Sequence, residues 1–72
     1  MSKHKSKVMN ALKKRFKTVL SVGKRSDGAM TFLADSKPVE ALVKRNEESG
    51  EYTTTIRIYQ KGWVTFKKLT YK

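Results

Sequence analysis

The end of the chain contains two runs of β-forming residues joined by a short loop, and this feature limits the possible folds more than any other. Residues 52–59 and 63–71 are rich in β-branched and aromatic residues, and Gln60-Lys61-Gly62 separates them. A glycine in the third loop position suits a type I turn followed by a bulge. The sequence therefore predicts an antiparallel C-terminal hairpin, and with it a fold that contains a β-sheet.

The loop also predicts which residues of this hairpin face each other. Pairing begins at Tyr59 and Trp63 and continues through Ile58–Val64, Arg57–Thr65 and Ile56–Phe66. One face is then entirely apolar and is expected to be core: Ile56, Ile58, Val64 and Phe66. The alternative two-residue loop, Lys61-Gly62, would set Ile56 against Lys67 and Ile58 against Thr65, and would interrupt that apolar face. The opposite face carries threonines, cations and aromatic rings: Thr55, Arg57, Tyr59, Trp63, Thr65 and Lys67.

The first part of the chain has the pattern of an amphipathic helix from Ser6 to about Lys17. Val8, Leu12 and Phe16 are four residues apart and form one apolar stripe. Lysines gather on the opposite side of the helical wheel: Lys3, Lys7, Lys14 and Lys17. Lys5 would fall on the apolar stripe, so we expect the helix to begin after it and residues 1–5 to be mobile.

The segment after this helix predicts a second hairpin. Ser26-Asp27-Gly28 is a typical three-residue turn, in which the glycine supplies a positive φ. This loop pairs Arg25 with Ala29, and further along Val22 with Phe32 and Leu20 with Ala34. Alternatively, the helix extends to a cap at Gly23, and the sheet has three strands instead of four.

A short helix is expected between the two hairpins. Ser36 can act as its N-cap, Pro38 suits its first turn, and Ser49-Gly50 ends it after about Glu48. Its apolar stripe would be Val39, Leu42 and Val43, with Glu40 and Lys44 as an i,i+4 ion pair. The predicted fold class is α+β: one domain over residues 1–72, with an N-terminal basic helix, an antiparallel sheet of three or four strands and one short helix between the hairpins.

The charge of the chain is strongly positive and unevenly distributed. The 72 residues include 17 Lys and Arg against six Asp and Glu, a net charge of +11. Residues 1–25 carry nine of these cations and no acid, whereas all six acids lie within residues 26–51. Such a charge distribution predicts a polyanionic partner. The chain has no cysteine, which excludes disulfides and thiolate metal sites.

Nucleic acid, DNA or RNA, is the polyanion that we expect, because it is abundant inside cells. Phosphate contacts are assigned to the cations of the N-terminal helix: Lys3, Lys7, Lys13, Lys14, Arg15 and Lys17. A second surface would add base stacking to cationic contact: Arg57, Tyr59, Lys61, Trp63 and Lys67. The cross-strand pair Tyr59–Trp63 has an alternative role, since such a pair stabilises a hairpin by itself. Lysine outnumbers arginine thirteen to four, which favours phosphate contact over the reading of base edges.

Other classes of function fit the sequence less well. A regulatory protein that docks on an acidic surface of a larger protein is the main alternative, and the acidic helix from Glu40 to Glu48 would allow self-association against the basic helix. Catalysis is not expected, since His4 is the only histidine and no carboxylate–histidine spacing suits a metal. We expect no cofactor, no small-molecule substrate and no membrane binding. Without a signal-type apolar segment, the expected location is cytoplasmic.

Overall fold

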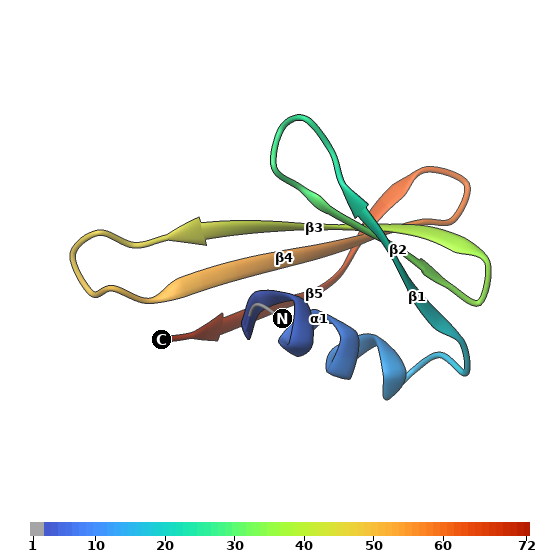
Figure 1. The fold of residues 1–72 in the computed structure, drawn as a ribbon, viewed down its shortest axis with the longest axis horizontal. Coiled ribbons are helices and arrows are strands. Elements are labelled where there is room, and N and C mark those ends of the chain that lie inside the picture. Colours follow the sequence, from blue (N-terminus) through green and yellow to red (C-terminus); the bar gives the residue numbers. More distant parts are fainter. Residues whose placement is uncertain (1–2) are drawn as a thin grey trace.

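The computed structural model describes residues 3–72, which form one helix followed by a five-stranded antiparallel sheet (Figure 1). The helix and strands are α1 (Lys3–Lys13), β1 (Val19–Lys24), β2 (Met30–Ala34), β3 (Lys37–Arg45), β4 (Tyr52–Tyr59) and β5 (Trp63–Tyr71). Each strand pairs with the next one along the chain, in the order β1-β2-β3-β4-β5. The predicted α+β class is therefore confirmed.

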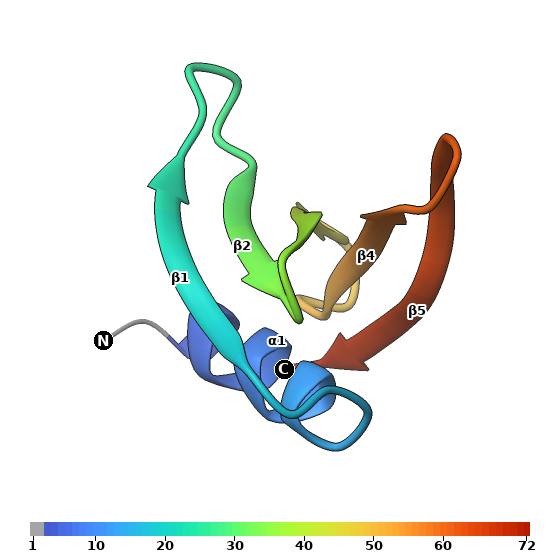
Figure 2. The same ribbon diagram turned by 90° about the vertical axis from the view of Figure 1, so that its right-hand side faces the viewer.

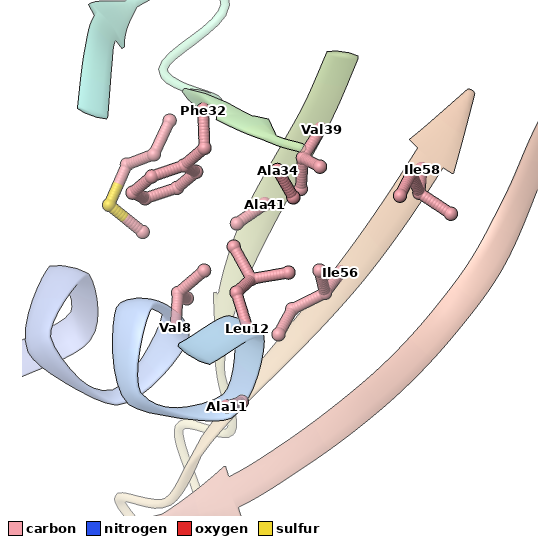
Figure 3. Packing of buried hydrophobic residues seen from close by; sticks show 10 residues of the cluster. Val8, Ala11, Leu12, Phe32, Ala34, Val39, Ala41, Ile56 and Ile58 are labelled. Carbon is pink, nitrogen blue, oxygen red and sulfur yellow. The ribbon is translucent and has the colours of Figure 1, made fainter. Parts of the chain in front are cut away.

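Helix α1 packs against one face of the strongly twisted sheet, and the outer strands β1 and β5 lie on either side of it (Figure 2). Val8 and Leu12 are fully buried and point from the helix toward the sheet (Figure 3). They meet inward side chains from β2, β3 and β4: Phe32, Val39, Ala41, Ile56 and Ile58. The apolar stripe predicted for the helix thus anchors it to the sheet, and the face of the sheet without the helix is called the open face below.

The helix begins and ends earlier than expected. It starts at Lys3 and ends at Lys13, where the backbone N–H groups of Arg15 and Phe16 both donate to the carbonyl oxygen of Leu12, at 3.0 and 2.8 Å. Lys5 lies within the helix, half-buried, beside a hollow that Met30 and Phe32 also line. A lysine can cover apolar surface with its aliphatic stem, so a position at the edge of the stripe does not end the helix. Of the five residues expected to be mobile, 1 and 2 lie outside the described residues, and 3–5 form the first turn.

The β1–β2 hairpin has the predicted loop but not the predicted register along its whole length. The N–H of Arg25 donates to the carbonyl of Ala29 at 2.9 Å, which closes the three-residue turn. A bulge between Ser21 and Gly23 then shifts the pairing, so that Phe32 faces Ser21 and not Val22. The pairing of Leu20 with Ala34 was also wrong, since Leu20 faces Leu33. Val22 is the extra residue and is 62% exposed.

The helix predicted after Ser36 is wrong, because residues 37–45 form the central strand β3. Asp35 and Ser36 adopt φ values of 49° and 67°, which make a tight turn that sends the chain straight back along β2. The N–H of Asp35 donates to the carbonyl of Thr18 at 2.8 Å, and the Asp35 carboxylate accepts the N–H of Thr18 at 2.8 Å. Val39 and Ala41 belong to the buried core, whereas Glu40 between them pairs with Arg57 on the other face of the sheet, as alternation along a strand requires. The acidic helix that was expected to support self-association therefore does not form.

The C-terminal hairpin has the predicted boundaries, with β4 ending at Tyr59 and β5 beginning at Trp63. The first predicted pairs, Tyr59–Trp63, Ile58–Val64 and Arg57–Thr65, are also found. Beyond them a bulge in β5 places Lys67 opposite Ile56, so the predicted Ile56–Phe66 pair was wrong. Phe66 is half-buried against Phe16, at 5.5 Å between ring centroids. Val64 was expected in the core but is 45% exposed, since it lies at the start of the edge strand β5 beside an open hollow that Phe16 and Phe66 also line.

Candidate nucleic-acid interface

Lysines from the helix region and from β5 meet along one side of α1. Lys7, Lys14 and Lys67 line a hollow of about 260 Å³, together with Asn10, Ala11, Leu69, Thr70 and Tyr71. These eight residues define the α1–β5 groove. None of them carries a carboxylate, and the three lysines are exposed to solvent. The groove therefore combines a concentrated positive charge with three neutral side chains that can hydrogen-bond, Asn10, Thr70 and Tyr71.

Two kinds of local geometry bring these lysines together. Lys7 and Lys14 are seven residues apart, which is about two helical turns, so they lie on the same side of the helix region. Lys67 comes from β5, where the bulge places it opposite the inward residue Ile56 and hence on the helix side of the strand. The sequence had predicted Lys67 on the open face beside Arg57. The structure does not bring those two residues together.

The start of α1 is held against the ends of β4 and β5 by a cluster of rings and hydroxyl groups. His4 Nδ1 hydrogen-bonds to the Tyr71 hydroxyl at 2.7 Å, and the same hydroxyl pairs with Thr54 Oγ1 at 2.6 Å. The Nζ of Lys3 lies 4.5 Å from the centroid of Tyr52, and the Nζ of Lys7 lies 4.8 Å from that of Tyr71. His4 thus has a structural place that its terminal position in the sequence did not indicate, and Lys3 continues the row of lysines beyond the groove.

The other cations assigned to the helix are spread more widely. The Arg15 guanidinium lies 5.8 Å from the centroid of Phe66 and lines a separate hollow with Phe16 and Val64. Lys13 is exposed in the last turn of α1, and Lys17 is exposed in the segment before β1. Of the six predicted helix cations, Lys7 and Lys14 share the groove and Lys3 adjoins it.

On the open face, the predicted aromatic pair is present with a geometry that limits stacking. The rings of Tyr59 and Trp63 are 5.6 Å apart at an interplanar angle of 71°, and the side chains are 48% and 39% exposed. An edge-to-face pair does not present one flat platform to successive bases. Arg57 lies 5.9 Å from the Trp63 centroid, whereas Lys61 is exposed in the turn.

Arg57 is already paired with a carboxylate that sequence reasoning had placed elsewhere. Glu40, only 3% exposed, contacts Arg57 Nη1 at 3.2 Å and Arg25 Nη1 at 2.6 Å. Arg25 also pairs with Asp27 at 2.8 Å. This hydrogen bond lowers the pKa of Asp27, and a second, smaller contribution comes from the hydrogen bond that the backbone N–H of Ala29 donates to the same carboxylate. We call these four residues the arginine–carboxylate cluster: Arg25, Asp27, Glu40 and Arg57. Two cations and two acids give it a formal charge of zero, so Arg57 is not a free ligand for phosphate.

Comparison of the chain with protein-family models, with curated proteins and with solved structures found no match. Within residues 3–72, no helix has both the length and the apolar character needed to cross a bilayer. The same residues contain no group of three or more histidine or acidic side chains placed to hold a metal ion.

Proposed function

We propose that this protein binds nucleic acid by contacting the phosphate backbone through the α1–β5 groove. The observation that carries the proposal is the meeting of Lys7, Lys14 and Lys67 on a surface whose lining residues include no acid. Holding like charges together costs free energy in the unbound protein, and a polyanion in the groove relieves this repulsion. The same binding also stabilises the fold, since the groove exists only in the folded state.

The chemistry of the groove favours contact with phosphate over the reading of base edges. Lysine ammonium groups act as compact point charges, and each can follow a phosphate without a fixed orientation. Asn10 and Thr70 add hydrogen-bonding groups that suit phosphate and sugar oxygens. Affinity would therefore depend little on base sequence and strongly on salt. Residues Lys3 to Lys13 extend over about 15 Å of helix, which matches several consecutive nucleotides.

Removing the three groove lysines tests this proposal. The variant Lys7→Ala, Lys14→Ala, Lys67→Ala is expected to bind a labelled DNA duplex about 100-fold more weakly at about 0.1 M salt, and its log–log salt slope should be about 2.7 units shallower. Fluorescence anisotropy with duplex and single-stranded oligonucleotides, measured between about 0.05 and 0.2 M salt, gives both quantities.

A control with the same change in net charge shows whether position matters. Lys37, Lys44 and Arg45 are exposed on β3 and lie outside the groove. Replacing these three residues by alanine should leave the salt slope close to that of the wild type. Equal weakening by both triple variants would mean that only net charge matters. If no oligonucleotide binds at low salt, the proposal is wrong, and docking on an acidic protein surface becomes the better account.

A further inference from the structure

The open face of the sheet carries a row of apolar side chains that crosses all five strands. Leu20 faces Leu33, and Leu33 faces Pro38. On the other side of the sheet, Tyr59 faces Trp63. Because Val39 pairs with Ile58 in an antiparallel register, Pro38, which precedes Val39, lies beside Tyr59, which follows Ile58. We call these residues the apolar row: Leu20, Leu33, Pro38, Tyr59 and Trp63.

The apolar row is unusually exposed for residues of its type. Leu20 is 56% exposed, Tyr59 48% and Trp63 39%. The row lies on the face opposite to the inward residues Val39 and Ile58, which belong to the core that α1 covers, so the helix does not cover the row. Several large apolar side chains gathered on one face are typical of a surface that binds a partner protein.

The charges beside the apolar row indicate which partner suits it. The next row across the sheet contains Thr31, Glu40, Arg57 and Thr65, and Arg25 and Asp27 complete the neutral arginine–carboxylate cluster there. The chain as a whole has a charge of +11, so two copies repel each other over most of their surface. Within the apolar row and this next row, the only charged side chains are the paired ones of the arginine–carboxylate cluster, so two copies can approach over these two rows without opposing free cations. Lys44 and Lys68 lie further along the open face. A nucleic acid would instead meet two carboxylates and arginines that are already paired.

We propose that the apolar row is the contact between two copies of this chain, which form a symmetric dimer through their open faces. A two-fold dimer buries the same patch on both copies, and sheet faces pack well at about 10 Å. In this arrangement both α1–β5 grooves point away from the contact, which keeps the strongest positive charges apart. The proposal does not rest on nucleic-acid binding, since it concerns the opposite face of the sheet.

Salt distinguishes the two proposals. Screening weakens the repulsion between two copies of charge +11, so dimerisation should strengthen as salt rises. Phosphate binding should weaken over the same range. Failure of one proposal therefore leaves the other intact.

Sedimentation equilibrium of the wild type, Leu20→Lys and Val64→Lys, at about 0.1 and 0.5 M salt, tests the dimer. Val64 is the matched control because it is 45% exposed and lies on the helix side of the sheet. We expect the wild type and Val64→Lys to dimerise, more strongly at the higher salt, and Leu20→Lys to require at least about tenfold higher concentration. Circular dichroism should show that both variants remain folded, since both positions are exposed.

Trp63 provides an independent readout, because it is the only tryptophan and lies in the apolar row. Its emission should shift to shorter wavelength as the wild-type concentration rises, and this shift should be absent from Leu20→Lys. A wild type that stays monomeric at about 100 μM in the higher salt would overturn the proposal. Equal loss of the dimer in both lysine variants would also overturn it, because the contact would then not depend on the apolar row. So would a change in the Trp63 emission of the monomer on adding oligonucleotides, because that result would assign this face to the binding of bases.

Discussion

Leu12→Ala is expected to lower the free energy of unfolding by about 2–5 kcal/mol. Leu12 is fully buried at the centre of the contact between α1 and the sheet, and it contacts the same core as Val8 and Ile56. A domain of this size has a total stability of about 4–11 kcal/mol, so the loss is a large fraction of it. Urea unfolding followed by circular dichroism measures the difference from the wild type.

The next residue along the chain is a control for helix propensity. Lys13 lies in the last turn of α1 and is exposed. Lys13→Ala should therefore change stability by no more than about 0.5 kcal/mol. If Leu12→Ala has a similarly small effect, α1 is not anchored to the sheet in the way described. The α1–β5 groove, which depends on the position of α1 beside β5, would then not be a fixed feature of the fold.

Removing both arginines around Glu40 should destabilise the protein by about 1–3 kcal/mol, the cost of leaving a buried group without its hydrogen-bond partners. The double variant Arg25→Met, Arg57→Met keeps much of the apolar stem of each side chain but leaves a carboxylate that is 3% exposed without either partner. Each single variant should cost less, because the remaining arginine still pairs with Glu40 and both arginines are partly exposed. A double-mutant cycle measured by urea unfolding gives the coupling between them.

A third substitution shows whether the stranded carboxylate is the cause. Adding Glu40→Gln to the double variant removes the unpaired charge, so stability should partly recover. Arg45→Met, at an exposed position at the end of β3, is the control for loss of a cation and should be almost neutral. A double variant as stable as the wild type would show that Glu40 is solvated and that the arginine–carboxylate cluster contributes nothing to stability.

Local sequence patterns were sufficient to predict the secondary structure at the two ends of the chain. The apolar spacing of Val8 and Leu12 predicted the helix, and the loop before Trp63 predicted the C-terminal hairpin with its correct boundaries. Both predictions depend on residues only a few positions apart. A turn glycine and a helical stripe act over that distance, which is why they can be recognised without knowledge of the remaining chain.

The centre of the chain could not be assigned in this way. Val39, Leu42 and Val43 fit a helical stripe, whereas Val39, Ala41 and Val43 fit one face of a strand. The choice depends on β2 and β4, which pair with β3 on both sides and supply hydrogen-bond partners along nearly its whole length. A segment with two compatible patterns adopts the one that its neighbours in space can satisfy.

The bulges limited the prediction of the site. Loop chemistry sets the register next to a turn, but the extra residues Val22 and Phe66 shift it further along each hairpin. The shift in β5 moves Lys67 from the open face to the groove beside Lys7. The bulge lets β5 bend around α1, so its position depends on a helix more than fifty residues away in the sequence.

The sequence by itself determined the net charge, the amphipathic helix and the C-terminal hairpin, because composition and short-range patterns are sufficient for these. Only the tertiary structure decided that β3 is a strand, that Glu40 neutralises Arg57, and that Lys67 joins the helix lysines. These outcomes depend on strand register and burial between residues far apart in the chain. Three of the cations expected to bind a polyanion thus meet in the α1–β5 groove, whereas the opposite face carries an apolar row beside a neutral cluster.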